Sequence, residues 1–473
     1  MNPKKWSRKW SVSLLAFPFL TLVAGCGAGM SNPALQPQSG TVFVSGTDAP
    51  LRSVVSFQVD ITGLSVTDAN NNSQSVLSGT QTVDFARLNG LHTLLDINTI
   101  PAGTYNSVTV TLANPQISFL NVANPPTTPP TRPTVTTLNG TTSPPVTLTT
   151  SSVTVNLATP LVVSTGNITG LSFEFNLRKS IAVDATGQIT GAVTPVLHLK
   201  AITPSDADAF IDDFIAGVVS VNAGGNSFAI QGPHGHQFTV NVNAQTEWEN
   251  NESINDLTTS SIIELSGTLD RLTATFLADS VGILSQDHFF AGGLVTFEEP
   301  QTGTATDFDL FVRSVLPSGI GLNSGQISTI NLTGNEIFYV YWMHNNFTNM
   351  FFNASLFTPG QHVSIGGPFT NGTVTVKRVV LRHEGHVGTL VANSTNVGAH
   401  TFQFNSNGLA GVLFNGPITV FVTPFTRFGG GLTQLSDLSS NPTNPLRVVG
   451  LVLKDPVSGQ PVFVARSVVE LMN

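Results

Sequence analysis

The chain has 473 residues, of which 40% are apolar and only 10% are charged, so it can bury large cores and is no charge-rich disordered protein. It holds 43 Gly and 28 Pro and is rich in Thr, Ser, Asn, Val and Phe, a composition that favours strands and turns and excludes an all-helical protein. The formal net charge of −9 argues against a nucleic-acid partner.

The N-terminus has the pattern of a secretory signal, which predicts a signal peptide over residues 1–25. Four cationic side chains precede an apolar run over residues 12–23, namely Lys4, Lys5, Arg8 and Lys9. The run is shorter than the ~20 residues that a membrane helix needs, and Pro18 interrupts it. A permanent membrane span is therefore not expected.

The end of this segment, Val23-Ala24-Gly25-Cys26, resembles the bacterial lipobox, and Cys26 is the chain's single cysteine. The resemblance implies that Cys26 becomes the lipidated N-terminus and tethers the protein to a membrane of the cell envelope. Gly27 at the next position favours the outer membrane over the inner one. The alternative is that Cys26 is an ordinary residue of a peptide cleaved elsewhere. After cleavage 15 Lys and Arg would face 28 Asp and Glu, a net charge of −13.

Beyond a flexible tether at residues 26–39, short apolar alternations predict a β-sandwich domain over residues 40–203. The Pro-rich stretch at residues 121–150 is predicted to be an exposed extended loop, because proline has no ladder donor. Three pieces of this region resemble a secreted bacterial family, domain of unknown function 4382: Thr47-Asp48-Ala49-Pro50, Ile100-Pro101-Ala102-Gly103-Thr104-Tyr105, and residues 173–181 followed by Pro195-Val196-Leu197. The resemblance implies a β-sandwich with no established chemistry.

Residues 204–215 are predicted to be an acidic linker, and beyond them an internal repeat of strands recurs three times. The order of strands predicts three small β-barrels at residues 216–286, 287–384 and 385–473, and resembles the tandem barrels of domain of unknown function 5666. Gly267, Gly366 and Gly450 are expected at matching places, each allowing a bulge. The predicted fold class is thus mainly β: an N-terminal sandwich followed by three barrel repeats.

Three polar clusters are candidate metal sites. The imidazoles of His234-Gly235-His236 and His383-Glu384-Gly385-His386 have a spacing that can share a metal ion, yet they are expected to be exposed turn residues. The carboxylates of Asp206, Asp208, Asp212 and Asp213 could attract Ca²⁺, yet no EF-hand pattern is present and a solvated linker is the better interpretation. No metal, cofactor or catalytic residue is predicted.

The most distinctive feature of the sequence is the aromatic segment at residues 338–344, inside the second repeat. On a strand, Tyr339, Tyr341 and Met343 would share one face and Trp342 the other. These four residues are the candidate ligand-binding residues. Their face could stack on a sugar ring, grip a partner protein or pack against a neighbouring barrel.

The sequence therefore predicts a lipid-anchored cell-envelope protein that acts as a non-catalytic binding or scaffolding module. Its expected partners are the membrane, through the lipid at Cys26, and a glycan or an envelope protein. The alternative is a carbohydrate-active or other hydrolytic envelope enzyme without a recognisable motif.

Overall fold

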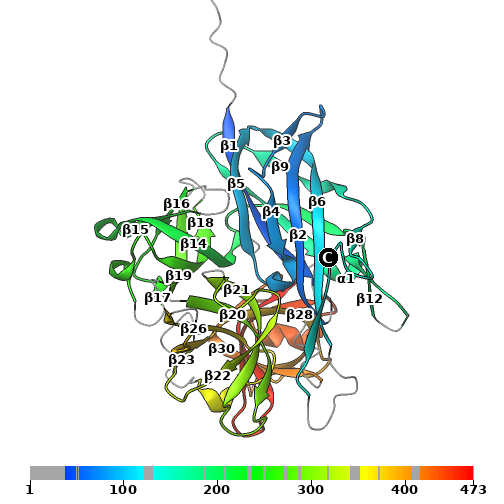
Figure 1. Ribbon diagram of the computed structural model, residues 1–473. Helices are drawn as coiled ribbons and strands as arrows, with labels where there is room; N and C mark the ends of the chain where they lie inside the picture. The colour runs from blue at the N-terminus through cyan, green and yellow to red at the C-terminus, as the bar shows by residue number, and fades with distance from the viewer. Residues whose placement is uncertain are drawn as a thin grey trace, which may run out of the picture. The chain divides into compact units, whose positions relative to one another are not determined.

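The computed structural model divides the chain into two units, Met1–Pro37 and Gln38–Asn473. It describes residues 38–49, 51, 53–121, 131–185, 188–206, 209–231, 237–248, 252–270, 275–285, 289–316, 319–340, 352–370, 373–406 and 416–471. The described part is mainly β and forms several sheets (Figure 1). The expected signal peptide and Cys26 lie outside the described residues.

The helical segments of the described residues are all short, at most six residues long. They are α1 (Leu177–Ser180), η1 (Phe85–Leu88), η3 (Ala223–Gly225), η6 (Ile254–Asp256), η7 (Ala354–Leu356) and η8 (Leu435–Ser440). Within the residues described, no helix has the length and apolar character that crossing a membrane requires.

Two sheets form the N-terminal region, drawn in blue to blue-green in Figure 1. The four-stranded sheet has the order β13-β10-β1-β5, with β1 (Ser39–Ala49), β5 (Thr93–Pro101), β10 (Ile168–Asn176) and β13 (Leu197–Ile202). The six-stranded sheet holds β2 (Val54–Asp68), β3 (Ser73–Ser75), β4 (Gln81–Asp84), β6 (Gly103–Asn121), β7 (Thr134–Leu138) and β9 (Ser152–Val163). A small sheet contains β8 (Thr147–Leu148), β11 (Ile181–Val183) and β12 (Ile189–Val193).

Side-chain alternation explains how these sheets share one core. Val108, Val110 and Leu112 of β6 are buried at every second position, as a strand with one covered face requires. Phe173 and Phe175 of β10 come from the other sheet and join the same apolar cluster. The Pro-rich stretch is more ordered than predicted, because residues 134–138 pair with β6 as β7.

The next sheet, here called the first ring, runs through residues 211–285. Its strands are β14 (Ile211–Asn222), β15 (Ser227–Gln231), β16 (Gln237–Asn241), β17 (Glu247–Trp248), β18 (Ile262–Leu269) and β19 (Phe276–Ser285). A parallel pairing of β16 with β19 closes it. Within the ring, β14 also pairs with β18.

The middle sheet follows the same strand order at residues 289–381. It contains β20 (Phe289–Glu299), β21 (Asp307–Leu316), β22 (Ile327–Asn331), β23 (Ile337–Val340), β24 (His362–Gly367) and β27 (Arg378–Leu381). Two further strands, β25 (Phe369–Thr370) and β26 (Thr373–Val374), form a separate two-stranded sheet. No pairing among its described residues closes it into a ring. The stretch that would close it, β26, pairs with β25 in a hairpin instead.

The last ring closes again. It consists of β28 (Glu384–Leu390), β29 (Thr401–Ser406), β30 (Ile418–Gly429), β31 (Leu446–Lys454) and β32 (Pro461–Glu470). In all three sheets the first strand pairs with the second and with a later strand, which in turn pairs with the last strand.

One of the three glycines expected to match is displaced by one residue. Gly267 and Gly450 each lie where the register shifts against the last strand of their ring. A Cβ there would meet a backbone oxygen at 2.1 Å and 2.0 Å, respectively. In the middle sheet the equivalent is Gly367, whose Cβ would meet Thr375 O at 2.1 Å, rather than Gly366, whose nearest such oxygen is 3.3 Å away.

Apolar clusters join the sheets across the unit Gln38–Asn473. Phe43 and Leu94 of the N-terminal region belong to the core of the first ring. Val55 and Leu120 pack with Leu294 and Phe311 of the middle sheet. These shared clusters join the N-terminal region to the first ring and to the middle sheet.

Candidate functional site

The structure describes one of the four predicted ligand-binding residues. Tyr339 lies in β23, where it is half-buried and pairs with Val380. Its neighbour Phe338 packs edge-on against Phe352 and Phe357 in the core of the middle sheet. Tyr341, Trp342 and Met343 lie outside the described residues.

The histidines at the start of the last ring are not exposed turn residues as predicted. His383 and His386 are 8% and 3% exposed, and Glu384 between them is 5% exposed. They are buried because this segment begins β28, which pairs with β31 in the interior. His386 Nε2 lies 3.2 Å from Glu384 Oε2, and His386 Nδ1 lies 3.2 Å from Ser406 Oγ. The other predicted histidine cluster, His234 and His236, lies outside the described residues.

The acidic linker prediction also fails for two of its carboxylates. Asp213 is 6% exposed, and the Asp212 side chain is 11% exposed. Both lie where the register between β14 and β18 shifts, so the bulge turns them inward. Asp206 is exposed, and its side chain accepts the Thr203 amide in a turn. Asp208 lies outside the described residues.

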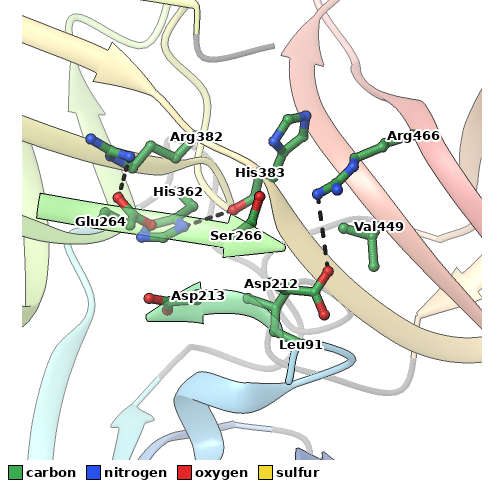
Figure 2. A pocket seen from close by; sticks show the side chains of 10 residues that line it. All are labelled: Leu91, Asp212, Asp213, Glu264, Ser266, His362, Arg382, His383, Val449 and Arg466. Atoms are coloured by element: carbon green, nitrogen blue, oxygen red, sulfur yellow. Dashed lines mark hydrogen bonds and ion pairs between the residues drawn. The ribbon is translucent and has the colours of Figure 1, made fainter. Parts of the chain in front are cut away.

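These inward carboxylates belong to a buried polar cluster that we call the central junction (Figure 2). Arg382, beside His383, forms an ion pair with Glu264 of β18, and its Nε donates to Ser364 Oγ at 2.7 Å. The two charged side chains are only 3% and 13% exposed. This pair links the first ring to the middle sheet.

Asp212 is the second hub of the central junction. Its Oδ2 accepts the His92 amide at 3.0 Å and lies 3.4 Å from His92 Nδ1. Its Oδ1 lies 4.0 Å from Arg466 of β32, as Figure 2 shows. Arg447 of β31 reaches the His92 ring at 3.1 Å. Asp212 therefore connects the N-terminal region, the first ring and the last ring.

Burial lowers the pKa of two histidines of the junction, His362 and His383. Burial, followed by the charge of Arg313, lowers the pKa of His362 to about 4. Burial likewise lowers the pKa of His383 well below its ordinary value. His362 Nδ1 donates to the His383 carbonyl at 2.9 Å, which fixes its tautomer. Across the described ranges, no group of three or more His, Cys, Asp or Glu residues is placed to hold a metal ion.

The space left inside the junction is small. Asp212, Glu264, His362 and Arg382 line a cavity of about 20 Å³. Room for one water begins at roughly 10–15 Å³ measured this way, so a substrate does not fit. Ion pairs between its own residues fill the junction instead, and this arrangement ties strands together rather than presenting reactive groups.

One carboxyl has a pKa suited to acid–base chemistry. Burial and the nearby Asp279 raise the pKa of Glu247 to about 8, against the opposing charges of Arg466 and Arg427. Glu247 lies in β17, and the cavities at the junction do not include it in their linings.

A larger cleft opens beside the junction, and the sequence patterns do not predict it. It has a volume of about 320 Å³ and is lined by residues of β4, η1, β5 and β14 together with Arg313 of β21. The signal in the sequence was the scarcity of cationic residues, because the chain has only 19 Lys and Arg in 473 residues and Arg313 lies in the predicted second barrel repeat.

Three comparisons with known proteins bear on identity. No match is found among curated proteins. The solved structure of MbnP from Methylosinus trichosporium is similar over 33% of this chain and 80% of its own, with 12% identity and a TM-score of 0.15. A likeness this weak supports no argument about fold or function. A family model for a domain of unknown function matches residues 39–190, so this part of the chain is a DUF4382 domain.

Proposed function

We propose that this protein is a lipid-anchored component of the cell envelope that acts as a non-catalytic binding or scaffolding module. Its architecture in this proposal is a DUF4382 β-sandwich followed by three barrel repeats of the DUF5666 type. The lipobox-like segment ending at Cys26 supports the anchor, and the acidic mature chain suits a protein that keeps off anionic lipid surfaces.

The observation that carries the scaffolding role is the central junction. Its charged groups have the residue types of an active site, yet they are buried and engage one another across separate sheets. The Arg87 guanidinium lies 3.3 Å from Asp213, and Arg382 forms an ion pair with Glu264. A junction of this kind holds β units in a fixed arrangement, as a scaffold needs.

The anchor is tested by mass spectrometry of the native N-terminus and by membrane fractionation of Cys26→Ser. We expect an acylated Cys26 in the wild type and release of the variant from the membrane fraction. An unmodified Cys26, or unchanged fractionation of the variant, contradicts the anchor.

The non-catalytic role is tested with the purified protein on envelope glycans and on ester and peptide substrates. We expect no turnover above that of a heat-denatured sample. Turnover that decreases in Glu247→Gln would favour the hydrolytic alternative over the scaffold, because the pKa of Glu247, raised to about 8, suits a general acid.

A further inference from the structure

The cleft beside the junction has the composition of a small-molecule site. Its volume of about 320 Å³ falls within the ~300–1,000 Å³ typical of such sites. Its walls combine apolar and polar residues in about equal share, with Val83, Leu94 and Phe214 among the buried apolar ones. Exposed Thr82 at its edge shows that solvent reaches it. The polar groups among these walls define what the cleft can recognise.

The principal polar group is Arg313. It is half-buried, and its Nε is buried with no hydrogen-bond partner. In the portion of the chain that the structure describes, its guanidinium forms no ion pair. Burial lowers the pKa of Arg313, and the nearby carboxylates of Asp84, Glu384 and Asp213 oppose this shift without forming an ion pair with it. A buried guanidinium is costly unless an anion bonds to it directly. Most other buried arginines of this region, such as Arg382 and Arg447, already contact side chains of the protein.

A β-bulge in the backbone sets the direction of the Arg313 side chain. The register between β20 and β21 shifts so that Val312 pairs with Gly293 and Ser314 with Gly292, leaving Arg313 as the extra residue of a bulge. Bulges commonly re-aim a side chain beside functional sites. Gly293 permits this bulge, because a Cβ there would lie 1.9 Å from Phe311 O.

The surrounding charges select the kind of anion. Arg87 also lines the cleft, but Asp213 lies 3.3 Å from it and offsets its charge. Asp84 places a carboxylate in the same lining, with its Oδ1 accepting the Phe57 amide at 2.9 Å. This local balance favours a singly charged carboxylate over a doubly charged phosphate. A guanidinium also matches a carboxylate with two parallel hydrogen bonds.

A second polar group without a hydrogen-bond partner, the side chain of Gln81, indicates what else the ligand carries. Gln81 lines the cleft, and its Oε1 is buried without a hydrogen-bond partner. A buried carbonyl oxygen needs a donor. We propose that the cleft binds a small carboxylate bearing a hydroxyl or amine donor, with Arg313 holding the carboxylate and Gln81 accepting from the donor. This inference deepens the binding role proposed above and names its ligand class.

The test uses the purified mature chain, with calorimetric titration and thermal melting at pH 7. The probes are D-glucuronate, D-lactate and D-alanine, with glucose as the uncharged control and inorganic phosphate as the alternative anion. We expect at least one carboxylate probe to bind and to raise the melting temperature, and glucose to do neither. Binding of phosphate alone, or of no probe, overturns the proposal.

Variants separate a ligand-binding arginine from a structural one. Arg313→Gln should weaken carboxylate binding at least about tenfold, since hydrogen bonds to charged groups contribute roughly 1.5–3 kcal/mol. Without ligand its melting temperature should equal or exceed that of the wild type, because an unpaired buried charge has been removed. Arg313→Lys should bind at an intermediate strength. Arg178→Gln, at an exposed arginine of α1, is the matched control and should bind normally.

Two outcomes contradict the assignment of Arg313. One is unchanged carboxylate binding by Arg313→Gln. The other is a marked loss of melting temperature in both Arg313→Gln and Arg313→Lys without ligand, which would make the arginine structural. Gln81→Ala provides an independent check, because it should weaken the hydroxy acid probes while the fold is retained. If the cleft binds no carboxylate, the proposed lipid anchor and scaffolding role are unaffected, because their tests involve Cys26 and the central junction.

Discussion

At the scale of single residues, the junction depends on complementary buried charges that sequence patterns do not reveal. Arg382 and Glu264 are 118 positions apart, and Arg447 and His92 are 355 apart. A one-dimensional pattern gives no register between such distant positions. The prediction of exposed side chains followed from their place between strands. It failed for His383, His386, Asp212 and Asp213, because those segments lie at the beginnings of strands inside the junction, whereas Asp206 is exposed as predicted.

The Arg382–Glu264 pair provides the first prediction. Arg382→Met should destabilise the protein by about 3–5 kcal/mol, because it leaves Glu264 charged and buried without its partner. Adding Glu264→Leu should recover most of the loss, since apolar side chains then replace both charges. Thermal and urea denaturation measure both. Equal stability of the single variant and the wild type would show that the pair is not a structural contact.

Glu247 provides a prediction about pH. Its pKa in the folded protein is raised to about 8 by burial and by Asp279. The folded state therefore holds a proton that the unfolded state releases near pH 4.5, and stability falls as pH rises from about 4.5 through 8. The lowered pKa of His362 acts oppositely, reducing stability as pH falls from 6.5 toward 4.

Melting temperatures of the wild type and Glu247→Gln between pH 6 and 9 test this assignment. The wild type should lose stability toward alkaline pH more steeply than the variant. Parallel curves would show that Glu247 ionises at an ordinary pH in the folded protein.

At the scale of elements, strand periodicity predicted most of what the structure contains. The alternation in residues 107–112 and the strand pattern of residues 171–177 both correspond to observed strands. Two of the three expected repeats contain closed rings, and the middle sheet keeps the strand order without closing in its described residues. The closure could not be predicted because it depends on whether residues 373–374 pair with β22 or form their own hairpin.

The glycine of each bulge gives a prediction with an internal control. Gly367→Ala should destabilise the protein by a few kcal/mol, since a Cβ would lie 2.1 Å from Thr375 O and the strands must separate. Gly366→Ala should cost much less, because its nearest backbone oxygen is 3.3 Å away. Thermal melting of the two variants makes the comparison. A larger loss for Gly366→Ala would contradict the one-residue correction of the repeat.

At the scale of the whole molecule, the sheets of Gln38–Asn473 are joined by more than the chain itself. Arg132 pairs with Asp307 at 2.5 Å and with Asp309 at 2.6 Å, linking the N-terminal region to the middle sheet. Lys454 of the last ring lies 2.9 Å from Glu298 of β20. Sequence composition could predict separate β domains, but it could not predict these contacts, because each joins strands whose order in space is set by the tertiary fold.

Differential scanning calorimetry of the mature chain tests the structural role of the central junction most directly. If the central junction fixes the sheets into one body, the wild type should melt in a single transition whose calorimetric and van't Hoff enthalpies agree. Arg382→Met should split this transition, because the contact between the first ring and the middle sheet is lost. Several separate transitions in the wild type, unchanged in Arg382→Met, would contradict the junction as the structural centre of the protein.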